Sequence, residues 1–139
     1  MKELEITATV ENLPKVIKFV EEQIAAFGCP LGVRAQIDVA VEEVFVNIAH
    51  YAYYPDTGPA VVRVETVKEP LQVILTFLDH GVPFDPLKKN DPNIEQPLNN
   101  RDPGGLGIFM VRKIMDAVSY EYRNGQNILT FSKKVKQSK

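Results

Sequence analysis

The sequence predicts an α+β fold in which three helices cover one face of a mostly antiparallel sheet. Five segments have the pattern of strands, and four of them form two pairs joined by short turns, which is typical of antiparallel hairpins. Three other segments carry apolar residues at helical spacing, and such helices bury their apolar side against a sheet. The 139 residues, 45% of them hydrophobic, fit a single domain over residues 1–139.

The N-terminal part is expected to contain one strand and two helices. Residues 3–10 alternate apolar and polar side chains, as a half-buried strand does. Asn12 is expected to cap the first helix, with Pro14 in its first turn, and Gly28 to follow its end. The second helix is expected over residues 33–53, with a core stripe formed by Ile37, Ala40, Val41, Val44 and Ile48.

The remaining elements alternate between hairpins, a long loop and one more helix. We expect strands at 60–68, 71–79, 117–123 and 126–133, and a helix from about 105 to 116. Glu69-Pro70 and Asn124-Gly125 are the predicted hairpin turns. Residues 80–104 hold five of the ten prolines, and a loop of this length is expected to be a lid or a binding loop.

Composition restricts the function and the compartment. The net charge of −2 gives no electrostatic basis for binding nucleic acid. Cys29 is the single cysteine, so the chain cannot form an internal disulfide. Since His50 and His80 are the only histidines, the chain also has too few ligands for a Cys/His metal cluster. No stretch approaches the roughly 20 apolar residues of a membrane span, and the N-terminus lacks the pattern of a signal peptide. We therefore expect a cytoplasmic protein without a membrane segment.

The second helix carries the first candidate site. Glu43, Asn47 and His50 follow one another at i, i+4 and i+7, and no lysine or arginine occurs between Arg34 and Arg63. A semi-exposed helix face with Asn47 bonded locally is one interpretation. The other is a Mg²⁺ site, because Mg²⁺ takes one or two protein oxygens and completes its shell with water and phosphate. Glu43 is then the candidate base toward a hydroxyl at the γ-phosphate.

Two further motifs lie at the end of a strand and at the start of a helix. Asp79 closes an apolar strand and precedes Gly81, so it is either a turn-forming residue or an acceptor for an exocyclic amine such as that of adenine. Gly105 and Gly107 open the third predicted helix, where free N–H groups attract phosphate. The motif is neither a P-loop nor a dinucleotide fingerprint.

The order of these motifs resembles the GHKL ATPase superfamily of gyrase, histidine kinases and MutL. Glu43 to Asn47 looks like its N box, Asp79-His80-Gly81 like its first glycine box, and Gly105-Leu106-Gly107 like its second. Within the superfamily the chain most resembles the bacterial anti-sigma factor serine/threonine kinases, through residues 47–53, 79–86 and 105–111. Pro83 departs from the wider superfamily, which often has glycine there, and favours the anti-sigma branch.

The resemblance implies a fold, ligands and partners. It implies the Bergerat ATP-binding fold, a two-layer α/β sandwich in which three helices cover one face of a mostly antiparallel mixed sheet, with an ATP lid at about 80–104. It also implies ATP and Mg²⁺ as ligands and a homodimer. Two protein partners follow from it: a sigma factor, and a STAS-domain antagonist that the kinase phosphorylates on serine or threonine.

The resemblance also assigns roles to single residues. Asn47 is expected to bind Mg²⁺, Asp79 to accept from the adenine amine, and Gly81 to line the adenine. The backbone amides at Gly105, Leu106 and Gly107 are expected to meet the phosphates. His50 is either a nucleotide contact or a supporting core histidine. Arg101 is either a solvated loop charge or a contact to the γ-phosphate when the lid closes.

Two alternatives to an anti-sigma kinase remain open at this stage. A non-catalytic module could bind ATP and act by sequestering its partner, although Glu43 and Asn47 are both present. The chain could instead be the ATP-binding half of a histidine kinase. That function requires a phosphoacceptor helical hairpin upstream, for which residues 1–32 leave no room.

Overall fold

The computed structural model describes residues 1–68, 71–88 and 105–135, with the backbone alone at residue 88 and at residues 105–107. The predicted hairpin turn at residues 69–70, most of the predicted lid and Arg101 lie outside the described residues. The strands are β1 (Lys2–Thr7), β2 (Pro59–Lys68), β3 (Leu71–Asp79), β4 (Ala117–Arg123) and β5 (Gln126–Lys134). The main helices are α1 (Leu13–Ala26), α2 (Leu31–Asn47) and α3 (Gly105–Ile114).

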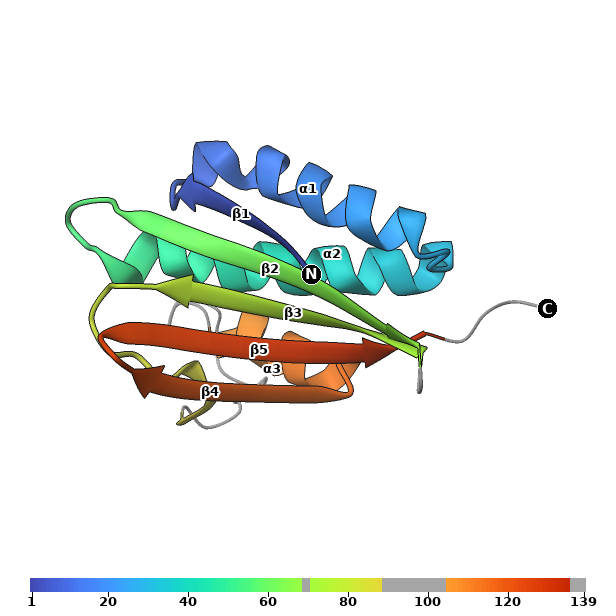
Figure 1. Ribbon diagram of the computed structural model, residues 1–139. Helices are drawn as coiled ribbons and strands as arrows, with labels where there is room; N and C mark the ends of the chain where they lie inside the picture. The colour runs from blue at the N-terminus through green and yellow to red at the C-terminus, as the bar shows by residue number, and fades with distance from the viewer. Residues whose placement is uncertain (69–70, 89–104, 136–139) are drawn as a thin grey trace.

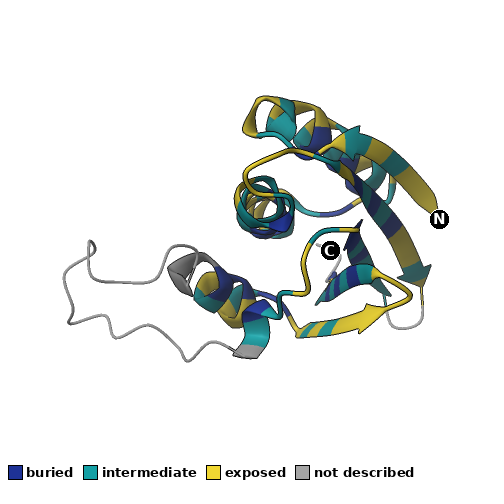
Figure 2. Ribbon diagram, turned by 90° about the vertical axis from the view of Figure 1, so that its left-hand side faces the viewer, coloured by how far each residue is buried: buried dark blue, intermediate teal, exposed yellow. Residues whose placement is uncertain are grey.

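The five strands form one sheet in the order β1-β2-β3-β5-β4 (Figure 1). All four pairings are antiparallel, so the expectation of a mixed sheet is wrong for the described strands. The three helices lie on one face of this sheet (Figures 1 and 2). The α+β fold class is therefore confirmed, with a central strand, β3, that is bonded on both sides.

The core lies between the helices and the inner face of the sheet. On the strands it follows the two-residue period, since Val73, Leu75 and Phe77 alternate with half-buried neighbours along β3. Phe77 stacks on Phe131 of β5 with ring centroids 5.8 Å apart. Helix α2 is the central helix, because it packs against both α1 and α3.

The first turn of the fold differs from the sequence expectation. Strand β1 ends at Thr7 rather than near Val10, and a short 3-10 turn over Val10–Asn12 leads directly into α1. Asn12 therefore already has helical backbone angles, φ −88° and ψ −4°, and lacks the extended conformation of an N-cap. Its side-chain amide donates instead to the carbonyl of Thr7, at 2.8 Å.

Helix α2 continues beyond Asn47 as a π-helical segment, Ile48–Ala52, so the expected span of 33–53 is confirmed in its extent. Its start is tied to α1 by Arg34, whose Nε and Nη2 donate to Glu21 Oε2 at 3.0 and 2.8 Å. Nearby, Asp38 Oδ1 is buried without a hydrogen-bond partner among the described residues. Burial raises the pKa of Asp38 to about 7, and the neighbouring Glu21 adds to the rise.

No described helix has the length and apolar character to cross a membrane.

Candidate functional site

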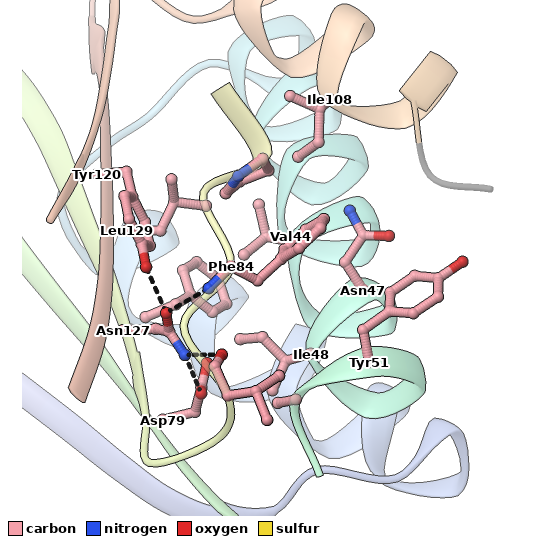
Figure 3. A pocket seen from close by; sticks show the side chains of 14 residues that line it. Val44, Asn47, Ile48, Tyr51, Asp79, Phe84, Ile108, Tyr120, Asn127 and Leu129 are labelled. Atoms are coloured by element: carbon pink, nitrogen blue, oxygen red, sulfur yellow. Dashed lines mark hydrogen bonds between the residues drawn. The ribbon is translucent and has the colours of Figure 1, made fainter. Parts of the chain in front are cut away.

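A pocket opens between α2 and the sheet, at the end where β3 finishes and β5 begins (Figure 3). Its walls enclose about 470 Å³, part of which is open to solvent. The lining is mainly apolar and includes Val44, Ile48, Tyr51, Ala52, Phe77, Val82, Phe84, Pro86, Ile108 and Leu129. Four polar side chains interrupt it: Asn47, Asp79, Tyr120 and Asn127.

Asp79 is the buried carboxylate of this pocket, 5% exposed. It ends β3 on the side of the sheet that faces the helices, two residues beyond the core residue Phe77. Its Oδ1 accepts from the backbone N–H of Gly81 and from Asn127 Nδ2, both at 2.9 Å. No described donor reaches its Oδ2. An ionised carboxylate only accepts hydrogen bonds, so Oδ2 can receive a donor from a ligand in the pocket.

Asn127 connects the pieces of this site. It is 6% exposed and is the cross-strand partner of Asp79 in the β3–β5 ladder. Its Nδ2 also donates to the carbonyl of Val82 at 2.9 Å. Its Oδ1 accepts from the N–H of Phe84 at 3.1 Å and from the hydroxyl of Tyr120 on β4. One side chain thus joins two strands and the segment that follows Asp79 (Figure 3).

The segment after Asp79 packs closely on Ala52, at the end of the π-helical segment that follows α2. A Cβ at Gly81 would lie 2.2 Å from the carbonyl oxygen of Ala52, so no other residue fits without moving the backbone. The next N–H, of Val82, donates to that same oxygen at 2.9 Å. Gly81 is not among the residues that line the pocket, and its predicted contact with adenine stays a prediction. The contact with Ala52 is sufficient reason for a glycine here.

Tyr53 fixes the same corner from the other side. Its hydroxyl donates to the carbonyl of Pro59 at 2.6 Å and accepts from the N–H of His80 at 2.8 Å. Its ring occupies the space that a side chain at Gly58 would need, since a Cβ there would lie 2.5 Å from Tyr53 Cε1. The end of the π-helical segment, the start of β2 and the end of β3 are therefore held together beside Asp79.

Of the three residues predicted on one stripe of the helix, Asn47 lines the pocket, whereas Glu43 and His50 do not. Asn47 lines the pocket and projects from α2 across from Asp79 and Asn127 (Figure 3). Its amide makes no hydrogen bond to another described residue, so its oxygen is free for a metal ion. Glu43 is one turn earlier and half-buried, and burial followed by the charge of Glu42 raises its pKa. His50 is exposed and does not line the pocket itself, but its ring contacts edge-on the ring of Tyr51, which does.

The predicted glycine turn opens a helix, as expected. Helix α3 starts at Gly105, and Leu106 and Gly107 lie in its first turn. Ile108, the next residue, lines the pocket, so this helix end faces the same cavity as Asn47 and Asp79. Arg101, predicted as a lid contact, lies outside the described residues. Within the part of the chain that the structure describes, no group of three His, Cys, Asp or Glu residues could hold a metal ion.

Sequence reasoning missed Asn127, Tyr120, Tyr51 and Phe84. For Asn127 a signal existed, because it alternates with Leu129 and Phe131 on the inward face of β5. A polar residue in an inward series requires a buried partner. The rings of Tyr51 and Phe84, which both line the pocket, stack with their centroids 6.1 Å apart. No sequence pattern indicated that these two residues, distant along the chain, would be in contact.

Comparison with known proteins agrees with this geometry. The model of the histidine kinase-like ATPase domain family matches residues 6–133. The serine/threonine-protein kinase BtrW of Bordetella bronchiseptica is 26% identical over 129 residues, which is 93% of this chain and 90% of that protein. The serine-protein kinase RsbW of Bacillus cereus is 25% identical over 95 residues, 66% of this chain but only 58% of that protein.

A solved structure supports the fold. The crystal structure of the RsbU and RsbW domains of a Mycobacterium tuberculosis protein superposes with a TM-score of 0.67 at 17% identity. The match covers 97% of this chain and 33% of the mycobacterial chain. Because the family model matches nearly the whole sequence, the chain belongs to the histidine kinase-like ATPase domain family.

Proposed function

We propose that this chain is an ATP-dependent serine/threonine protein kinase that acts as an anti-sigma factor and phosphorylates a STAS-domain antagonist. Family membership and the kinase names of the relatives support the catalytic part. The motifs at residues 47–53, 79–86 and 105–111 support the anti-sigma part through their resemblance to that branch. The sigma factor, the antagonist and a homodimeric state belong to the proposal.

One observation carries the nucleotide assignment. Asp79 is 5% exposed, its Oδ1 accepts from two N–H donors, and its Oδ2 has no donor among the described residues, at a pocket whose lining is mainly apolar. A carboxylate oxygen accepts hydrogen bonds, so Oδ2 can receive a donor from a ligand in the pocket. A flat heterocycle with an exocyclic amine satisfies it, and the aromatic and aliphatic walls suit the ring faces. Adenine has both properties.

The triphosphate would extend from the base toward Asn47 and the first turn of α3. The free amide oxygen of Asn47 is a suitable Mg²⁺ ligand, and Mg²⁺ would supply charge neutralisation at the phosphates. The N–H groups at the start of α3, at Gly105 and Gly107, favour an anion.

Glu43 is the proposed general base. It makes no ion pair or hydrogen bond with another described residue, and burial raises its pKa, which favours a group that takes up a proton. In the proposed step the substrate hydroxyl oxygen forms a bond to the γ-phosphorus and its proton passes to Glu43. The bond between the γ-phosphorus and the bridging oxygen breaks, and ADP leaves with the electron pair.

Two measurements test this proposal in sequence. Saturation with Mg·ATP at about 100 times the dissociation constant should raise the free energy of unfolding by about 2.7 kcal/mol in a thermal melt. Incubation with γ-labelled ATP, Mg²⁺ and a STAS-domain protein from the same genome should then label serine or threonine on that partner, and EDTA should abolish the labelling.

The outcomes separate the competing functions. A melt that does not respond to Mg·ATP would refute the nucleotide site. A response without transfer to the partner would indicate a binding module that acts by sequestration. An acid-labile label on the chain itself would indicate histidine phosphorylation instead.

A further inference from the structure

Lys133 is a charged residue on the inward face of the sheet. The inward side chains of β5 alternate with outward ones and belong to Asn127, Leu129, Phe131 and Lys133. In the β3–β5 ladder Lys133 is paired with Val73, a fully buried core residue. A lysine seldom occupies such a position unless its ammonium group has a partner. The last inward residue of β5 therefore requires an acceptor.

The acceptor is the last residue of α3. Lys133 Nζ donates to the carbonyl oxygen of Ile114 at 2.7 Å, in a part-buried position. The last four carbonyls of a helix have no partner within the helix, and a cation beside them also interacts favourably with the helix dipole. One side chain of β5 thus satisfies a carbonyl of α3 and attaches the end of the helix to the sheet.

The chain is also attached to β5 just beyond this helix end. The N–H of Asp116 donates to the carbonyl of Ser132 at 2.9 Å, and the carboxylate of Asp116 accepts from the N–H of Lys134. These bonds hold the residues that lead from α3 into β4. Lys133 differs from them, because it bonds to the last residue of the helix itself.

The opposite end of α3 faces the pocket. The helix has ten residues, Gly105–Ile114, and is therefore about 15 Å long. Ile108, at the end of its first turn, lines the pocket (Figure 3). The proposed function places the triphosphate at the N–H groups of this first turn. A displacement of the helix end at Ile114 would move those N–H groups relative to Asn47.

We propose that Lys133 is a positioning residue for the triphosphate. By holding the C-terminal end of α3 on β5, it determines where the N–H groups at the other end of the helix meet the phosphates. It should therefore affect the part of the affinity that comes from the phosphates more than the part that comes from the base. The inference rests on the proposed nucleotide function and adds to it a residue remote from the ligand.

The test compares the binding of Mg·ATP with that of adenosine, which lacks the phosphates, by calorimetry. The dissociation constant of adenosine divided by that of Mg·ATP measures what the triphosphate contributes. Lys133→Met keeps a long apolar side chain but removes the ammonium donor. This ratio should fall by roughly 3–10-fold, a factor typical of the interaction between an anion and a helix N-terminus. The affinity for adenosine should stay close to that of wild type.

Lys134→Met is the matched control. Lys134 is the exposed neighbour of Lys133, and its substitution removes the same charge, so a general effect of charge on ATP binding would appear in both variants. Its bond to Asp116 comes from the backbone and is retained. The ratio in Lys134→Met should stay close to that of wild type. Lys133→Arg, which keeps a cationic donor, should recover most of the ratio that Lys133→Met loses.

The outcomes distinguish positioning from a purely structural role. A Lys133→Met protein that loses affinity for both ligands equally, or that keeps the wild-type ratio, overturns the inference. An equal fall of the ratio in Lys133→Met and Lys134→Met does so as well, since it reports charge only.

A second variant covers the case in which Lys133→Met does not fold. In Lys133→Gln the amide nitrogen is one bond closer to the backbone and carries no charge, so the ratio should again fall. An unchanged ratio in this variant overturns the inference. A wild type that binds neither Mg·ATP nor adenosine instead overturns the proposed function.

Discussion

Replacing Gly81 by alanine should destabilise the protein even without nucleotide. The added Cβ would lie 2.2 Å from the carbonyl oxygen, 2.5 Å from the carbonyl carbon and 2.6 Å from the Cβ of Ala52. The first two atoms are backbone, so the helix end or the segment after β3 must move. Overpacking of this kind costs about 1–3 kcal/mol. Loss of the bond from Val82 N–H to Ala52, now 2.9 Å long, adds about 0.5–1.5 kcal/mol.

The expected total is about 1.5–4.5 kcal/mol, which for a chain of this size lowers the melting temperature by roughly 5–20 °C. Thermal unfolding followed by circular dichroism measures it. Gly32→Ala is the control, because a Cβ at Gly32 meets nothing within 4 Å and alanine is the better helix former in α2. A Gly81→Ala protein as stable as the wild type would refute the argument that packing against Ala52 requires this glycine.

Three further changes test the site and the helix pair. Asp79→Asn should weaken ATP binding by about 10–100-fold in calorimetry, because the pocket loses its acceptor charge and gains a mispaired amide; unchanged affinity would remove Asp79 from the base site. Glu43→Gln should keep nucleotide binding but suppress phosphoryl transfer, whereas the exposed variant Glu22→Gln on α1 should transfer normally; a fully active Glu43→Gln excludes Glu43 as the base. Asp38 has a folded-state pKa of about 7, above the ordinary 3.8, so the folded state binds the extra proton and stability falls as pH rises between these values. Asp38→Asn should therefore gain melting temperature relative to wild type at pH 8 compared with pH 5, and an equal difference at both values would contradict the raised pKa.

Most of the fold was predictable because the local sequence pattern of most strands and helices agrees with the structure that they adopt. The alternation in β3 and β5, the Asn124-Gly125 turn and the apolar spacing of α1 indicate their elements directly. The pattern could not distinguish the π-helical segment after Asn47 from a continued α-helix, since both present similar faces over five residues. The sequence pattern also predicted that the Asn12 side chain caps α1, whereas Asn12 is the last residue of a 3-10 turn and its side chain donates to Thr7 instead.

The sequence indicated several individual residues of the site but not the hydrogen bonds and packing contacts that join them. The sequence indicated that Asp79 would be buried at a strand end and require a donor, and the structure supplies two for one oxygen. It did not indicate that one donor is Asn127, because cross-strand register between β3 and β5 depends on tertiary pairing. For Gly81 the sequence suggested the close approach of a ligand, and it could not indicate the second reason for a glycine, which is the close contact with Ala52, distant along the chain.

The pairing of Asp79 with Asn127 has a consequence for how the protein acquires its site. The two residues are 48 positions apart, and they meet at one end of the long-range ladder between β3 and β5. Closing a loop of that length has to precede the hydrogen bond, so β3 remains an edge strand until β5 is added beside it. A nascent chain leaving the ribosome can complete α1, α2 and the β2–β3 hairpin first. Its binding pocket exists only after the last strand has joined the sheet.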